Sequence, residues 1–509
     1  MMECNRETVK FDCFDTRNIT VKVSAKELLE EGAKLLSVTA LACCGRCEML
    51  NNEALVEGVV KFCAIYKTAD GEIRKTERSE RFGVNETIPG VMPKSYMLAK
   101  AEAEKVRGYI EAGSLMLTCS VHITGTLITP CQRELLTDLS GDDIRKKEEK
   151  VMLNCVSFTT PLRFTVTNDT ELSLRVPEVK EILCMNADAT VNEAHLSAGQ
   201  LILGGQIPLQ TIYLSADEYE PVIQVSDKMD FSQLIELKNV EGGSAPIVHL
   251  SVEDITVTVT PNAEGENRIL TYSVMLCGYA YMTEARECTL INDAYSTGGG
   301  LECTRETIKL SCTREPVTCA VNQHISVPIP EGKTPISRIS SVNFTPVITS
   351  CRMLDGRAEL EGSGEVSVIY MASGSGELEG FNVTVPIRLL CDNLDFEEDT
   401  QMMASASLTD MQAVLVSGGE VEIRAAFSAL FLPCACEDSE IITDARQGEA
   451  CDMPEFGIII YMAQKNETLW DICKRFGADM EEVMALNPDL GETPQQGQKI
   501  YIFRKLQVC

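Results

Sequence analysis

The chain has 509 residues, too many for a single hydrophobic core, so its length predicts roughly three or four domains. Its apolar fraction of 44% is that of a folded globular protein. The formal net charge of −31 argues against binding to DNA, RNA or an anionic membrane, since affinity for polyanions comes largely from Lys and Arg that neutralise phosphates. Proteins and neutral glycans remain as partner classes.

The first residues of the chain show no basic segment followed by an apolar core. No apolar stretch approaches the roughly twenty residues needed to span a bilayer. We therefore expect a cytoplasmic protein without membrane insertion. In that reducing compartment the 22 cysteines are expected to be free, small, buried side chains, with later oxidation in a durable assembly as the alternative.

An internal repeat indicates three copies of one unit. The segment 4–13 returns as 303–312 with the same residue at six of ten positions, and a weaker middle copy begins near Lys150. In each copy a tyrosine follows a glycine by eight residues: Gly58 and Tyr66, Gly205 and Tyr213, Gly362 and Tyr370. The tyrosines are 147 and 157 residues apart, which suits a duplicated domain rather than a solenoid.

These markers divide the chain into repeats at 1–148, 149–300 and 301–446. We expect the three domains to superpose, with the tyrosines at equivalent strand positions. Alternating residues, as at 115–121 and 271–276, predict half-buried strands, and clusters of Gly, Pro, Asn and Asp between them predict turns. The chain is therefore expected to be mainly β, built from three antiparallel sandwich or barrel-like domains.

Two stretches favour helices instead of strands. One is 25–36, which mixes acidic and apolar residues, and the other is the charged stretch 133–150.

Cys43, Cys44 and Cys47 form the sharpest local pattern in the repeats. A tetrahedral zinc site needs four ligands, and the other close pair, Cys434 and Cys436, belongs to a different repeat. We therefore interpret the cluster as structural, with metal or redox use as the alternative. No stoichiometric zinc is expected.

No catalytic constellation is recognisable in the sequence. The chain's four histidines fall at unrelated repeat positions, and neither a Gly-x-Ser-x-Gly elbow nor a phosphate-binding Gly-Lys-Ser/Thr loop is present. Paired acids in so acidic a chain are typical of solvated surfaces. We expect no catalytic, cofactor-binding or metal-binding residues, and no enzyme activity.

The last segment, 455–506, has the elements of a complete small α+β domain. The apolar run 458–462 predicts a strand, and Thr468 is placed to cap a first helix. Asp479 is placed to cap a second helix, and 499–503 predicts a closing strand. The order strand, helix, helix, strand predicts a module that folds independently of the repeats.

This segment resembles the LysM module. The matching residues are Tyr461, 468–470, 487–488 and 497–500, whereas Asn466-Glu467 replaces the usual Gly-Asp. The resemblance implies a groove for N-acetylglucosamine polymers between the loop before the first helix and the loop after the second. We expect the binding groove or partner surface to comprise Asn466, Glu467, Thr468, Leu469, Trp470, Lys474, Arg475, Asn487, Pro488 and Asp489. A core role for Leu469 and Trp470 is the alternative.

The repeats resemble the SPOCS domain of spore-coat proteins from endospore-forming bacteria, through the glycine and the following Ile-Tyr at 65–66, 212–213 and 369–370. Three copies followed by LysM resemble the SipL type of spore-coat morphogenetic protein. That resemblance implies a scaffold on the mother-cell face of the forespore that docks through LysM to the coat base-layer ATPase and contacts other coat proteins. The alternative is a protein that binds peptidoglycan or N-acetylglucosamine polymers.

Overall fold

The computed structural model describes residues 2–197, 199–217, 219–237, 246–313, 315–392, 394, 401–416, 420–448 and 457–504. Within these ranges the strands form seven antiparallel sheets. Six of the sheets belong to the repeats and one to the C-terminal module, which also holds the two short helices of these ranges. The expectation of a mainly β chain that ends in a small α+β module is confirmed.

The first repeat shows the shared plan of strands. Three consecutive strands form one sheet in the order β2-β3-β4, while the first and the last two strands form a second sheet in the order β1-β6-β5. The strands are β1 (Glu3–Leu28), β2 (Lys34–Leu50), β3 (Glu53–Lys67), β4 (Ile73–Thr87), β5 (Tyr96–Glu111) and β6 (Ser114–Ser140).

The second and third repeats follow the same plan, each with one strand divided in two. In the second, β8 and β9 both pair with β10 and together take the place of β2; in the third, β14 and β15 both pair with β20 and take the place of β1. The second repeat contains β7 (Ile144–Glu171), β8 (Val179–Ala187), β9 (Thr190–Ser197), β10 (Gln200–Ser215), β11 (Val222–Glu236), β12 (Ile247–Pro261) and β13 (Asn267–Ser296). The third contains β14 (Gly300–Thr313), β15 (Val317–Val327), β16 (Ile336–Leu354), β17 (Arg357–Ala372), β18 (Leu378–Cys391), β19 (Gln401–Leu415) and β20 (Val421–Gly448).

These pairings suggest where the repeats meet in the chain. We propose that the boundaries lie in the short connections 141–143 and 297–299, because the strands on either side of each connection belong to different sheets. The first of these connections precedes the boundary drawn from the sequence at 148 by a few residues.

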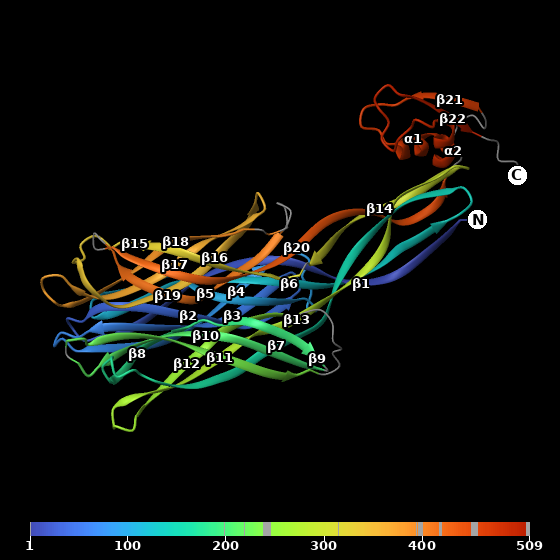
Figure 1. Cartoon of the computed structure of the whole chain (residues 1–509). Helices are drawn as coiled ribbons and strands as arrows, with labels where there is room; N and C mark the ends of the chain where they lie inside the picture. The colour runs from blue at the N-terminus through green and yellow to red at the C-terminus, as the bar shows by residue number, and fades with distance from the viewer. Residues whose placement is uncertain are drawn as a thin grey trace.

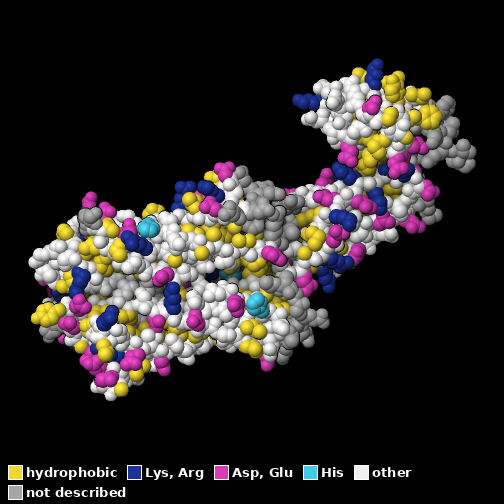
Figure 2. Space-filling model, viewed as in Figure 1, with side chains coloured by type: hydrophobic (Ala, Val, Ile, Leu, Met, Phe, Trp, Pro, Cys, Tyr) yellow, Lys and Arg dark blue, Asp and Glu magenta, His cyan; other side chains and the backbone are white. Residues whose placement is uncertain are grey.

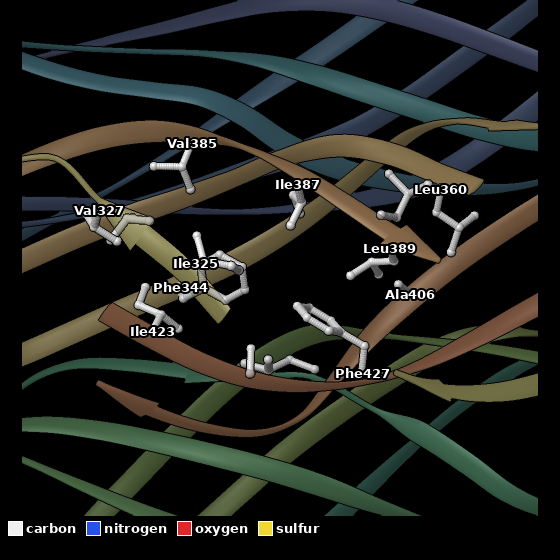
Figure 3. Close-up of a cluster of buried hydrophobic side chains, with 14 of the residues drawn as sticks. Ile325, Val327, Phe344, Leu360, Val385, Ile387, Leu389, Ala406, Ile423 and Phe427 are labelled. Atoms are coloured by element: carbon white, nitrogen blue, oxygen red, sulfur yellow. The ribbon is translucent and has the colours of Figure 1, made fainter. Parts of the chain in front are cut away.

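Each repeat is a sandwich whose two sheets enclose one core. In the third repeat, Phe344 on β16 and Phe427 on β20 meet edge to face with their ring centroids 6.1 Å apart (Figure 3). Ile325, Leu360 and Val385 complete the same buried cluster. Because successive side chains of a strand point to opposite faces, alternate apolar residues of the two sheets face each other and form this core.

The tyrosines lie at equivalent strand positions, as predicted. Tyr66, Tyr213 and Tyr370 each lie on the central strand of their sheet, on β3, β10 and β17. They pair with Leu35 on β2, Ile182 on β8 and Ile339 on β16, respectively. Tyr213 and Tyr370 belong to the cores of their own repeats.

The recurring glycines mark β-bulges. A Cβ on Gly58, Gly205 or Gly362 would lie 2.3, 2.1 or 2.0 Å from a backbone carbonyl oxygen of the neighbouring strand. Next to each glycine the strand register shifts by one residue. The glycine therefore recurs because two backbones approach too closely there for any side chain.

The two helix predictions, for 25–36 and 133–150, are wrong. Residues 25–28 belong to β1 and pair with 114–117 of β6, and Lys34 already begins β2. The stretch 133–150 forms the end of β6 and the start of β7. Strand pairing with residues far away in the chain therefore overrides the local helical preference of both stretches.

The three sandwiches pack around a shared centre. Ile65, Ile212 and Ile369 directly precede the three tyrosines and therefore point to the opposite face of each sheet. All three are buried in one cluster with Leu36 and Leu183. The duplication thus produces one body of three sandwiches side by side (Figure 1).

A stalk joins this body to the C-terminal module (Figure 1). Its strands are the extended ends of β1, β6, β7, β13, β14 and β20, so every repeat contributes to it. Two buried clusters hold the stalk together, one around Phe11, Leu153 and Leu310 and another around Leu139 and Ile442. The stalk presents β7 and β13 to the module.

Candidate functional site

The C-terminal module has the predicted order of elements: β21 (Gly457–Met462), α1 (Leu469–Phe476), α2 (Met480–Leu486) and β22 (Lys499–Arg504). Thr468 and Asp471 form the expected capping box of α1. The carboxylate of Asp479 accepts hydrogen bonds from two backbone amides at the start of α2, those of Glu481 and Glu482. Both helices therefore begin where the sequence predicted.

One face of α1 lies against the stalk. The Nε1–H of Trp470 donates to Oδ2 of Asp293 at 2.8 Å, and Nζ of Lys474 donates to both carboxylate oxygens at 2.6 and 2.8 Å. Asp293 lies on β13 and also forms an ion pair with Arg305 of β14. The carboxylate is mostly buried, so these charge-assisted bonds fix the module on the stalk.

Tyr295 continues this contact into the core of the module. Its ring packs edge to face on Trp470 with the centroids 5.0 Å apart, and its hydroxyl donates to the backbone oxygen of Ala478 at 2.9 Å. Arg145 on β7 pairs with Asp479. Sequence reasoning missed Asp293, Tyr295 and Arg145, because no local pattern around them indicates a contact with residues more than 170 positions away.

Docking of the module should weaken in acid. Burial raises the pKa of Asp293, but the hydrogen bonds from Lys474 and Trp470 outweigh it and hold the pKa below the ordinary value. A depressed carboxyl pKa contributes stability that is present above about pH 4 and is lost as the pH falls through the lower pKa of the docked state. We therefore expect Trp470, the chain's one tryptophan, to change its fluorescence below about pH 4.

The control for this acid transition is Asp293→Asn, which has no carboxylate to titrate and should lack most of the change. Circular dichroism of the sheets should stay constant over the same range. A fluorescence change that coincides with loss of the β signal would contradict undocking.

The residues expected to form the groove divide into four groups. Leu469 is buried in the core, and Trp470 and Lys474 contact the stalk. Glu467, Arg475 and Asn487 bond within the module, and Thr468 caps α1. Asn466, Pro488 and Asp489 are exposed on the two loops.

The backbone of the loop before α1 suits Asn466-Glu467, the pair that replaces the usual Gly-Asp. Asn466 adopts a φ of 63°, the left-handed region in which Gly is best and Asn is among the tolerated residues. The carboxylate of Glu467 is buried and accepts bonds from the Tyr461 hydroxyl and the backbone amide of Gln464. Asn487 similarly bonds to the backbone of Val483 and Tyr501, which closes the second loop.

Hydrophobic side chains gather on the surface of the module (Figure 2). The strands β21 and β22 bury one face on the helices and leave the other uncovered. We name this uncovered set the hairpin face; it consists of Ile458, Ile460, Met462, Tyr501 and Phe503, which are 42–70% exposed. Ile458 pairs with Phe503 and Ile460 with Tyr501, so the residues form a continuous strip. The sequence could have indicated this face, because the residues of 458–462 are apolar on both faces of the strand.

The described residues contain no group of three or more His, Cys, Asp or Glu side chains placed to hold a metal ion. The side chains of Cys434 and Cys436 lie outside this part of the chain. None of the helices in the described ranges has the length and apolar character needed to cross a membrane.

The fold defines a protein of repeated β-sandwiches that ends in a small α+β module. Residues 178–260, which span β8 to β12, match the family described as SipL, SPOCS domain, and residues 461–508 match the LysM domain. The chain therefore combines the two domain types of the SipL-type spore-coat morphogenetic protein. No curated protein and no solved structure matched the chain.

These two domain types indicate the function in general terms. The SPOCS domain suggests a role in the spore coat, and LysM suggests glycan binding. Both are typically binding or structural domains rather than catalytic ones.

Proposed function

We propose that the chain is a non-enzymatic scaffold of spore-coat assembly that docks through its LysM domain to the coat base-layer ATPase on the mother-cell face of the forespore. The observation that carries this proposal is the hairpin face, an uncovered apolar strip that holds two aromatic rings. Large exposed apolar patches are typical of protein interfaces, and aromatic residues are frequent anchors there.

The rest of the module supports a protein partner over a glycan. Trp470 and Lys474 are engaged by the stalk, and Glu467 and Asn487 are bonded within the module. Most polar residues expected in the groove are therefore already engaged, and Asn466 and Asp489 are the ones that stay exposed on the two loops. One face of α1 is covered by the stalk, whereas the hairpin face is apolar and uncovered.

The test is the affinity of the full chain for the purified ATPase, with Ile460→Asp as the variant. A charge placed in the middle of the hairpin face should weaken binding at least about tenfold, because interface anchors typically contribute 2 kcal/mol or more. Leu174→Asp is the matched control, since Leu174 is 75% exposed on the second repeat. Equal affinity of Ile460→Asp and the unchanged chain would contradict docking through this face.

Glycan binding is the second candidate, favoured by the LysM match and by exposed Asn466, Pro488 and Asp489. It predicts that the full chain sediments with insoluble peptidoglycan and that Asp489→Ala reduces this while Ile460→Asp does not. Sedimentation with peptidoglycan combined with no measurable affinity for the ATPase would favour the glycan function.

A further inference from the structure

Cys43 and Cys277 bring their thiols together across the boundary between the first and second repeats. Cys43 lies on β2 and Cys277 on β13, 234 positions away, and their Sγ atoms are 3.3 Å apart. A disulfide bond is about 2.05 Å long. The two sulfur atoms would therefore have to move closer by only about 1 Å to form one. The sequence showed Cys43 only as part of a local cluster with Cys44 and Cys47, and nothing in it indicated Cys277.

Polar contacts hold the two repeats in register beside this pair. Nζ of Lys61, on β3, donates to the backbone oxygen of Glu253 at 3.2 Å and pairs with Asp254 at 2.8 Å. Within the second repeat, Arg163 on β7 donates two bonds to the Glu253 carboxylate at 2.8 and 2.9 Å, which fixes the segment that Lys61 contacts. The facing strands β2 and β13 are thereby kept in place, so the short distance between the two thiols is maintained.

Small molecules can reach the pair. Cys43 and Cys277 are both partly exposed, and they line an open hollow of about 630 Å³ together with Lys100, Arg163 and Tyr279. This volume exceeds that of a small peptide thiol, so such a compound can enter and approach either sulfur.

The pKa values of the two thiols are shifted in opposite directions, and disulfide exchange needs one of them as a thiolate. The hydrogen bond from Cys277 lowers the pKa of the Cys43 thiol, and Lys61 and Arg163 act in the same direction, while burial and Glu253 oppose them. The same hydrogen bond raises the pKa of Cys277. Cys43 is therefore the thiol that ionises first, and the thiolate is the nucleophile in disulfide exchange.

We propose that Cys43 and Cys277 are an oxidation site whose disulfide joins the first repeat covalently to the second, with a low-molecular-weight disulfide as the oxidant. The Cys43 thiolate attacks one sulfur of the oxidant, which forms a mixed disulfide and releases one small thiol. Cys277 then loses its proton to solvent and attacks the Cys43 sulfur, which releases the second small thiol. Two protein thiols are oxidised, and one small disulfide is reduced to two thiols.

This bond would constrain the chain more than a local one. It closes a loop of more than two hundred residues, and the entropy removed from the unfolded chain grows with loop length. A bond between Cys44 and Cys47, whose Sγ atoms are 3.5 Å apart on the same strand, would close only a few residues and would not join the repeats.

The test is peptide mapping of the full chain after incubation with oxidised glutathione. Trypsin cleaves after Lys34, Arg46, Arg268 and Arg286, so Cys43 and Cys44 fall in peptide 35–46 and Cys277 in peptide 269–286. We expect loss of free peptide 269–286 and an equal gain of the linked peptide, both reversed by dithiothreitol. Thiol consumption that links 35–46 to 47–61 but never to 269–286 would overturn the proposal.

Two variants assign the bond to its residues. Cys43→Ser should abolish the linked peptide, while the matched control Cys44→Ser should retain it. If Cys43→Ser does not fold, Cys277→Ser and fragmentation of the linked peptide from the unchanged chain identify the bonded sulfur. A link that persists in Cys43→Ser would show that another cysteine is the partner and would contradict the proposal.

Discussion

Gly205→Ala is expected to destabilise the second repeat by about 3 kcal/mol, the upper end of the usual cost of overpacking. The new Cβ would lie 2.1 Å from the backbone oxygen of Thr190 and 2.6 Å from Cζ of Phe231. Rotation of a flexible side chain cannot relieve either contact, because the Thr190 atom belongs to the backbone and the Phe231 ring is buried. Thermal unfolding of the repeat should therefore begin roughly 6–12 °C lower.

Gly204→Ala provides a matched control in the same strand. Its Cβ would have no neighbour closer than 3.6 Å, so its stability should change by less than about 0.5 kcal/mol. Calorimetry of both variants measures the difference directly. Equal unfolding temperatures would contradict the explanation of the recurring glycine as a site of close backbone approach. Gly58→Ala and Gly362→Ala should repeat the effect in the other two repeats.

Asp293→Ala is expected to release the module from the stalk. It removes the acceptor for Trp470 and for Lys474, and hydrogen bonds to charged groups contribute about 1.5–3 kcal/mol each. The docking equilibrium should therefore shift by at least tenfold towards the free module. Because Trp470 is the chain's one tryptophan, its fluorescence reports this shift without a label.

The measurement is the emission maximum and the acrylamide quenching of Trp470. Both should change in Asp293→Ala towards a more exposed indole, and Tyr295→Ala should have the same effect, since it removes the ring that packs on Trp470. Tyr501→Ala is the control, because Tyr501 is 45% exposed on the hairpin face. Unchanged emission and quenching in Asp293→Ala would contradict docking through this carboxylate.

Local patterns in the sequence determined the fold class and the order of domains. Period-two alternation predicts strands because successive side chains of a strand point to opposite faces. The glycine and tyrosine eight residues apart identified the duplication because the bulge at Gly58 and its equivalents admits no side chain. Thr468 and Asp479 located the two helices of the LysM domain because capping depends only on neighbouring residues.

Tertiary structure decided everything that depends on distant parts of the chain. Residues 25–28, 34–36, 133–140 and 144–150 form strands because partners on β6, β3, β1 and β13 were available to pair with them. Trp470 was open to interpretation as an anchor or a core residue, and the answer lay with Asp293, which a sequence window cannot connect to it. The partner of Cys43 is Cys277 for the same reason. Short-range patterns set the local preference of each segment, whereas tertiary pairing can override that preference and decides which segments meet, because it depends on the free energy of the whole packed chain.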